Sequence, residues 1–171
     1  TDDVPPVADD FVLPPAPSLD DICLIQYTSG STADPKGASL THRNVVHNVA
    51  YLDEDWQHDE HSVSVNWLPA FHDLGLLYGI LAPVIGGFLS VQMSPIHVIQ
   101  RPQVWLQAMS DYKATHSGGP NFIYELSAKK VTDAEIAKLD LSNWRMGLTA
   151  AEPVRAETMK RFSDRFAPAG F

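Results

Sequence analysis

The sequence predicts an α/β fold in which helices flank a layered, mostly parallel sheet. Short apolar runs of strand length alternate with longer runs whose apolar residues recur at helical spacing, and this alternation is typical of a parallel sheet covered by helices. The composition, 44% apolar and 19% charged, is that of an ordinary globular domain. At 171 residues the chain is predicted to contain about one domain, and no internal repeat is visible.

The first segment of the chain is predicted to be a linker. Residues 1–20 are rich in proline and aspartate and contain few large apolar side chains. Such a segment cannot offset its ordering entropy by burial, so we expect an extended, acidic, proline-rich tether. Residues 21–171 are then predicted to form the folded part.

The strands and helices that follow are predicted from local patterns. Residues 22–27 form an apolar run of strand length. Residues 74–85 carry leucine and valine at helical spacing after Asp73, which can cap that helix, and Pro83 predicts a kink or a stop within it. In chain order we expect strands at 22–27, 62–68, 88–92, 114–117 and 144–149, and helices at 41–53, 74–85, 102–112, 120–130, 133–138 and 153–166.

Two of the later helices open with proline, Pro102 and Pro153. Proline is tolerated at the first helical position because the N–H that it lacks would have no partner there. Each helix carries an apolar stripe that we expect to be buried. The expected buried residues are Trp105, Ala108, Met109 and Tyr112 in the first of these helices, and Val154, Met159, Phe162 and Phe166 in the second.

Charge and cysteine content exclude some classes of partner. The formal net charge of −9 makes the chain a poor partner for a nucleic-acid backbone. No run of about 18 apolar residues is present, so no membrane span is expected. The single cysteine, Cys23, lies in an apolar strand and is interpreted as an inert thiol, which fits a reducing compartment.

The ten residues from Thr28 to Gly37 have the composition of a phosphate-binding loop. Glycine lets a backbone approach a ligand, successive N–H groups form an anion-binding nest, and hydroxyls and a lysine add donors. The spacing is not that of a Walker loop, because Lys36 precedes the second glycine. A solvated Ser/Gly linker is the alternative interpretation.

Two stretches contain histidine beside acidic residues. His72 next to Asp73 has the composition of a base with an orienting carboxylate, but a helix start with a packed histidine is an equally simple interpretation. His58 and His61 flank two acids in a pattern that metals accept, yet no second ligand cluster is apparent. We therefore expect a solvated turn at 58–61 and no metal site.

The turn Gly118-Gly119-Pro120 is predicted to end a strand and to start a helix. Loops at the carboxyl edge of a parallel sheet commonly bind ligands, so this turn is a candidate binding segment. A tight turn without a ligand is the alternative.

Four stretches together resemble one enzyme superfamily. The segment Thr28–Gly37 is similar to the signature T-S-G-S/T-T-G-x-P-K-G of adenylate-forming enzymes, with Ala33 in place of a glycine. The segment His72–Leu76 resembles H-D-M-G-L of fatty-acid-activating enzymes, and Met93–Phe122 resembles the fatty acyl-AMP ligase patterns M-S-P-x-x-F-L-Q-R-P-x-x-W-L and A-T-x-S-G-G-P-N-F. The segment Gly147–Val154 is similar to N-G-A-E-P-V, with Thr149 and Ala150 as departures.

The resemblance implies roles for individual residues, none of them catalytic within this chain. It implies ATP phosphate binding by Thr28, Ser29, Gly30, Ser31, Thr32, Lys36 and Gly37. It implies acyl or substrate binding by His72, Leu74, Gly75, Ser117, Gly118, Gly119 and Pro120. It implies that the adenine is bordered by Ala150, Ala151, Glu152 and Pro153.

The implied whole is a fatty acyl-AMP ligase, of which residues 21–171 would be part of the large N-terminal, AMP-binding domain. Such an enzyme uses ATP and Mg²⁺ to convert a fatty acid to an acyl-adenylate, and passes the acyl group to an acyl carrier protein or polyketide synthase module. Polyketide or lipopeptide biosynthesis in the cytoplasm is the implied setting. We expect a central, by itself inactive fragment of a longer ligase, with the Mg²⁺ ligand outside it.

Two alternatives remain open from the sequence. The chain has the features of an acyl-CoA synthetase or a peptide-synthetase adenylation domain as well, since these share the phosphate-binding signature. A non-catalytic nucleotide- or lipid-binding module is the second alternative.

Overall fold

The computed structural model describes residues 12, 14–28 and 35–171. The chain forms two compact units, residues 1–44 and residues 45–171. In the first unit, β1 (Ile22–Thr28) pairs antiparallel with β2 (Lys36–Thr41), so that Thr28 lies opposite Lys36. Most of the predicted linker, residues 1–11 and 13, lies outside the described residues.

The strand β2 was not predicted, because a loop was expected up to the helix at residue 41. Its sequence, Lys-Gly-Ala-Ser-Leu-Thr, has no apolar alternation, and four of its six residues are exposed. Pairing with the backbone of β1, and not burial of a side-chain face, makes it a strand, and such pairing leaves little trace in hydrophobic periodicity.

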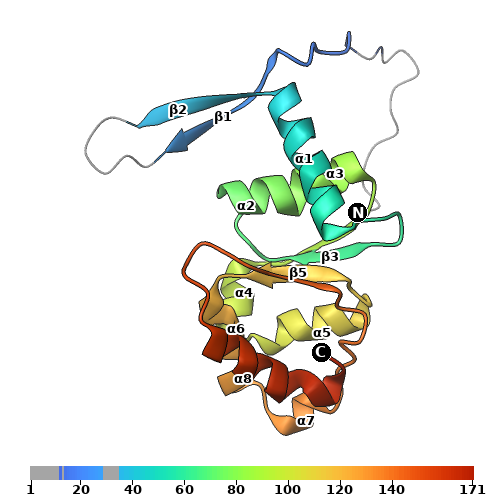
Figure 1. Cartoon of the computed structure of the whole chain (residues 1–171), viewed down its shortest axis with the longest axis vertical. Helices are drawn as coiled ribbons and strands as arrows, with labels where there is room; N and C mark the ends of the chain where they lie inside the picture. Colours follow the sequence, from blue (N-terminus) through green and yellow to red (C-terminus); the bar gives the residue numbers. More distant parts are fainter. Residues whose placement is uncertain (1–11, 13, 29–34) are drawn as a thin grey trace. The chain divides into compact units, whose positions relative to one another are not determined.

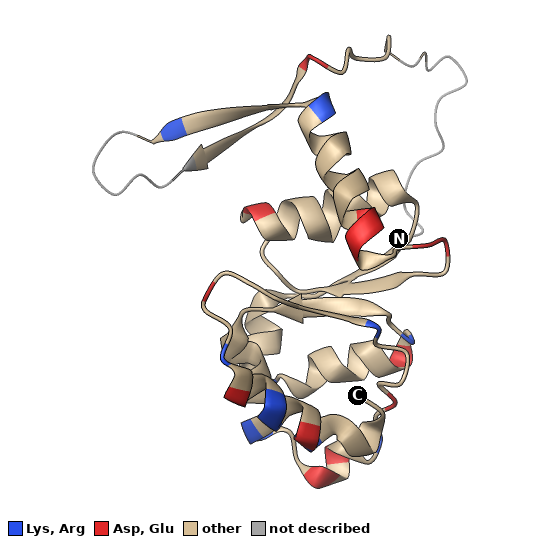
Figure 2. Ribbon diagram, in the orientation of Figure 1, with Lys and Arg blue, Asp and Glu red and all other residues tan. Residues whose placement is uncertain are grey.

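The second unit contains a four-stranded, fully parallel sheet in the order β4-β3-β5-β6, which confirms the predicted fold class. The strands are β3 (Val63–Asn66), β4 (Leu89–Gln92), β5 (His116–Gly119) and β6 (Met146–Thr149), each within two residues of its predicted bounds. None of them contains a charged residue, as Figure 2 shows. This pattern is expected of parallel strands covered on both faces.

Helices cover both faces of this sheet (Figure 1). The segments α1, α2 and α3 lie on one face, and α5, α6 and α8 lie on the other. The bounds are α1 (His42–Trp56, which begins in the first unit), α2 (Asp73–Leu76), π-helical η1 (Leu77–Leu81), α3 (Ala82–Gly86), α4 (Pro95–Gln100), α5 (Gln103–Asp111), α6 (Asn121–Lys130), α7 (Asp133–Ile136), α8 (Ala156–Phe166) and the 3₁₀ turn η2 (Ala167–Ala169). In the described part of the chain, none of these is long and apolar enough to cross a membrane.

The core of the second unit centres on aromatic side chains. Trp105 of α5 is fully buried, and its ring contacts those of Tyr124, Trp144 and Phe162 in edge-on or tilted arrangements. Its indole N–H donates to Ser117 Oγ at 2.8 Å, which fastens α5 to β5. Of the apolar residues predicted to be buried, Tyr112 and Val154 are instead more than half exposed, because α5 and α8 are shorter than expected and both residues lie outside them.

The helix predicted at 74–85 is divided into α2, η1 and α3, and Pro83 gives the physical reason. Proline has no N–H to donate to the carbonyl four residues earlier, that of Gly79. That carbonyl accepts hydrogen bonds from Gln92 Nε2 at 2.5 Å and Ser90 Oγ at 3.1 Å, both on β4. Within η1, the Ala82 N–H reaches Leu77 O, five residues back. The expected disturbance at Pro83 is therefore present, as a π-helical turn held against β4.

Candidate functional site

The carboxyl ends of the parallel strands gather several candidate segments at one edge of the sheet. The chain leaves β3 at Trp67, β5 at Pro120 and β6 at Ala150. From β3 the chain runs outward to β4 on one side and then returns to β5 on the other side of β3. The gap between β3 and β5 is thus a topological switch point, where ligands of open α/β sheets usually bind. The segments predicted to hold the acyl group and the adenine therefore share one edge.

Gly118 and Gly119, which were predicted to lie in a turn, instead extend the buried strand that contains Ser117. The space where a Cβ of Gly118 would stand is taken by Leu148 O at 2.0 Å, and that of Gly119 by the Trp67 ring at 2.4 Å. The Ser117 hydroxyl donates to Val65 O at 2.6 Å. These contacts supply a packing reason for the small residues, and Pro120 is the first residue of the group beyond the strand.

His72 lies at the start of α2 and is exposed. Its Nδ1 is 2.7 Å from Asp73 Oδ1, and the Leu74 N–H is 2.7 Å from the same oxygen. The Leu74 N–H has a second acceptor within reach, because its nitrogen is also 3.3 Å from His72 Nδ1. The N-cap residue of α2 is therefore His72, and Asp73, which was predicted to be the cap, is instead the first residue of the helix.

The residues after His72 are held close to the backbone that precedes it. A Cβ on Gly75 would stand 2.0 Å from Pro69 O, so only glycine permits this approach of α2 to the loop. Leu74 is half-buried. The packing fixes where α2 begins, and therefore where His72 stands at the sheet edge.

The segment Ala150–Pro153 follows β6 and leads toward α8. Ala151 has φ +70°, in the left-handed region that a residue with a Cβ seldom adopts. Glu152 Oε1 accepts a hydrogen bond from the Phe122 N–H at 2.8 Å. This contact is with the N-terminus of α6, 30 residues earlier in the chain.

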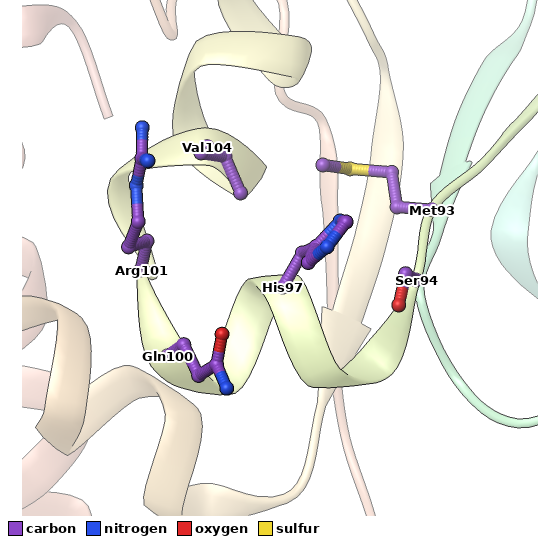
Figure 3. A pocket seen from close by; sticks show the side chains of 6 residues that line it. All are labelled: Met93, Ser94, His97, Gln100, Arg101 and Val104. Atoms are coloured by element: carbon purple, nitrogen blue, oxygen red, sulfur yellow. The ribbon is translucent and has the colours of Figure 1, made fainter.

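A pocket of about 540 Å³ lies beside the end of β4 (Figure 3). The side chains of Met93 and His97 point toward one another there, while Gln100 and Arg101 stand at the end of α4. The lining combines apolar and polar groups, namely Met93, Ser94, His97, Gln100, Arg101 and Val104. The pocket thus joins residues of the M-S-P and Q-R-P motifs that are adjacent only after folding.

The predicted phosphate-binding loop joins the two strands of the hairpin in the first unit. Thr28 ends β1, and Lys36 and Gly37 begin β2. Ser29, Gly30, Ser31 and Thr32 lie outside the described residues. Only Thr28, Lys36 and Gly37 of the predicted set are described, and the role of all seven residues stays a prediction.

The expectation of a solvated turn at 58–61 is wrong for His58. Its side chain is only 2% exposed and stacks on Phe88 at 4.3 Å, with the His116 ring also 4.3 Å away. His61 is 85% exposed, as a turn residue should be. Local periodicity carries no signal for this burial, because Phe88 and His116 come from distant parts of the sequence.

Burial lowers the pKa of His58, although the hydrogen bond to Asp53 opposes this effect. Burial also lowers the pKa of His116, whose Nε2 is 2.8 Å from the carbonyl oxygen of Trp56. His58 Nδ1 lies 2.8 Å from Asp53 Oδ1, while Nε2 has no partner among the described residues. A neutral ring that donates from Nδ1 leaves only a lone pair unsatisfied, which is cheaper than a buried N–H of a cation. Both histidines are therefore structural and neutral.

The family model for AMP-binding enzymes matches residues 2–170. The chain belongs to the AMP-binding enzyme family. It is 46% identical over 152 residues to the medium-chain fatty acid–acyl-carrier-protein ligase JamA of Moorena producens, which covers 89% of this chain. It is 45% identical over 157 residues, 92% of the chain, to TtuA of Teredinibacter turnerae, also a medium-chain fatty acid–acyl-carrier-protein ligase.

The fold of these AMP-binding enzymes is also found among solved structures. A fatty acyl-adenylate ligase from L. pneumophila, in complex with acyl adenylate and pyrophosphate, matches 93% of this chain with a TM-score of 0.87 and 40% identity. The chain spans about a quarter of the length of its relatives, 26% of JamA and 24% of TtuA, and 28% of the L. pneumophila chain. The resemblance inferred from the motifs is thereby confirmed at the level of the family.

Asn121 is a polar residue at this edge to which the sequence assigned no role. It is 5% exposed, and its Oδ1 accepts a hydrogen bond from the Arg155 N–H at 3.1 Å. The sequence signal for Asn121 was its position directly after Gly118-Gly119-Pro120, within the motif that resembles A-T-x-S-G-G-P-N-F. Its partner, however, is 34 residues away in the chain, so only the fold reveals the contact.

Proposed function

We propose that the protein carrying this chain activates a fatty acid with ATP and transfers the acyl group to an acyl carrier protein. The observation that supports this most is the combination of fatty acyl-AMP ligase motifs with two relatives, JamA and TtuA, that are fatty acid–acyl-carrier-protein ligases. The placement of the acyl and adenine candidate segments at one carboxyl edge agrees with such a reaction. Residues 21–171 would be part of its AMP-binding domain, after a linker at 1–20.

In the proposed first step, a fatty acid carboxylate oxygen attacks the α-phosphorus of ATP. The bond between the α-phosphorus and its bridging oxygen breaks, and pyrophosphate leaves with the electron pair. The hydroxyls and backbone N–H groups from Thr28 to Gly37, together with Lys36, would hold the departing phosphates by charge-assisted hydrogen bonds. In the second step, a carrier thiol displaces AMP from the acyl carbonyl and gives up its proton.

The residues at the sheet edge would supply positioning. His72, with Leu74 and Gly75, would line the path of the acyl group, and the end of β5 from Ser117 to Pro120 would form its floor. The segment Ala150–Pro153 would border the adenine. The Mg²⁺ that ATP requires would be held by an acidic residue outside residues 1–171, as the family resemblance implies.

The test uses the protein expressed from its complete reading frame. Hydroxylamine trapping with ATP, Mg²⁺ and a panel of fatty acids should give hydroxamate that depends on both the acid and ATP. Mass spectrometry should then find the acyl group on a phosphopantetheinylated carrier protein and none on CoA. Hydroxamate formed from amino acids but not from fatty acids would refute the proposed substrate class, and thioester formation with CoA would refute the proposed acceptor.

Two further parts of the proposal have their own tests. We propose that residues 1–171 alone are inactive, because the Mg²⁺ ligand is placed elsewhere, and robust hydroxamate formation by them would contradict this. If the chain were instead a nucleotide- or lipid-binding module, ATP or a fatty acid would raise its melting temperature without turnover. A cytoplasmic setting in polyketide or lipopeptide biosynthesis follows from the proposed acceptor, and detection of the acylated carrier domain of a polyketide synthase would support it.

A further inference from the structure

The loop after β6 is fastened to the start of α6 by two hydrogen bonds of its own. Glu152 Oε1 accepts from the Phe122 N–H at 2.8 Å, and Asn121 Oδ1 accepts from the Arg155 N–H at 3.1 Å. The Asn121 amide is also 3.4 Å from Thr158 Oγ1 on α8. One side chain from each segment therefore holds the backbone of the other, and on the loop the two bonds span residues 152–155.

The start of α6 needs such partners. The first N–H groups of a helix have no acceptor within the helix, and Pro120, which precedes α6, has no side-chain acceptor to offer. A carboxylate at a helix N-terminus is favoured by both the hydrogen bond and the helix dipole. Glu152 thus caps α6 from a distant part of the sequence, and the hydrogen bond directs its side chain toward the N-terminus of that helix.

The loop needs holding as well. Ala151 lies in the left-handed region at φ +70°, which costs free energy for any residue with a Cβ. Such a conformation persists only where the surrounding structure imposes it, and it is common at ligand-binding segments. Both side-chain bonds lie on the carboxyl side of Ala151 in sequence, one at Glu152, which follows it directly, and one at Arg155, four residues later.

We propose that Asn121 and Glu152 are positioning residues for the nucleotide: they hold Ala150–Pro153 in the conformation that meets the adenine, without touching the base through their own side chains. This inference rests on the proposed function. It attributes the preference of the protein for ATP over other nucleotides to the contact between α6 and the loop after β6. Loss of either bond lets the loop relax, so the base loses its complementary surface while the acyl side of the sheet edge is unchanged.

The test compares Glu152→Ala and Glu152→Gln in the protein expressed from its complete reading frame. Glutamine keeps an oxygen acceptor for the Phe122 N–H, whereas alanine removes it. We expect Glu152→Ala to raise the KM for ATP about tenfold, as loss of a charge-assisted hydrogen bond implies, and to reduce the preference for ATP over GTP. Glu152→Gln should restore most of the affinity, and the KM for the fatty acid should stay unchanged in both variants.

Asn121 provides the second pair of variants. Asn121→Ala should raise the KM for ATP in the same way, and Asn121→Asp, which keeps Oδ1 as an acceptor for Arg155, should restore it. Glu157→Ala is the matched control. Like Glu152, Glu157 is an exposed acid; it lies in the first turn of α8 and has no hydrogen bond or ion pair among the described residues. That control should leave both KM values and the nucleotide preference unchanged.

Hydrogen exchange, measured by mass spectrometry on the same proteins, reports on the contact without any turnover. Peptides that contain Phe122 and residues 150–155 should exchange faster in Glu152→Ala than in the wild type or in Glu157→Ala. An unchanged KM for ATP in an active Glu152→Ala protein would overturn the proposal, as would a parallel loss for both substrates with no rescue by glutamine. If the wild type itself lacks ATP-dependent activity, the proposed function fails, and unchanged exchange at Phe122 would then overturn the contact as well.

Discussion

Replacement of Gly118 by alanine tests whether close packing between β5 and β6 shapes the sheet at the carboxyl ends of its strands. A Cβ at residue 118 would stand 2.0 Å from the carbonyl oxygen of Leu148 and 2.7 Å from its Cβ. Leu148 is the register partner of Gly118 on the neighbouring strand, so the obstructing atom belongs to the backbone of a hydrogen-bonded sheet. A flexible side chain could rotate away, but this carbonyl has no such freedom.

The magnitude follows from the overlap. Real Cβ atoms essentially never come closer than 3.0 Å to such a neighbour, so β5 and β6 must move apart by about 1 Å, which weakens the four-residue ladder between them. Overpacking of a rigid site typically costs about 1–3 kcal/mol, and we expect the upper end here. For a domain whose unfolding free energy is of the order of 5–15 kcal/mol, that is a large fraction.

The matched control is Gly147→Ala on β6. The nearest atoms to a Cβ there are Trp144 Nε1 and Tyr124 Oη, both at 3.8 Å, which is ordinary contact distance. Its unfolding free energy should change by no more than about 0.5 kcal/mol. Urea unfolding followed by tryptophan fluorescence measures both variants, and the reasoning is refuted if Gly118→Ala is no more destabilising than Gly147→Ala.

Two further predictions concern pH and backbone strain. Burial lowers the pKa values of His58 and His116, so at acidic pH the unfolded chain binds protons that the folded chain does not. The contribution of the two neutral histidines to the unfolding free energy is therefore fully present above about pH 6.5 and is lost as the pH falls below it. The slope is up to about 1.4 kcal/mol per pH unit for each histidine. Urea midpoints at pH 7.5 and 5.5 should differ accordingly, also in a His61→Gln control, and equal midpoints would contradict the assignment. Ala151→Gly removes the Cβ from a left-handed residue, so we expect it to gain up to about 1 kcal/mol of stability instead of the usual loss for alanine to glycine; a lower urea midpoint would show that Ala151 is not strained.

Much of the fold was predictable because its signals are local. The four parallel strands were predicted within two residues of their bounds, and Pro83 predicted a disturbance in its helix. The strand β2 was missed because pairing with β1, not side-chain alternation, defines it. The burial of His58 was missed for a related reason, since the rings that cover it, Phe88 and His116, come from distant parts of the sequence.

The sequence by itself determined the class of the fold, the family and the short motifs that matter. Each of these depends on the order of residues within short, contiguous segments of the chain. The tertiary structure decided what those motifs contact. It placed the segments after β3, β5 and β6 at one sheet edge, turned Glu152 to the N-terminus of α6, and paired Asn121 with Arg155. These contacts join residues 30 or more positions apart, and they depend on strand order and on the packing of α6 beside α8, which no local pattern encodes.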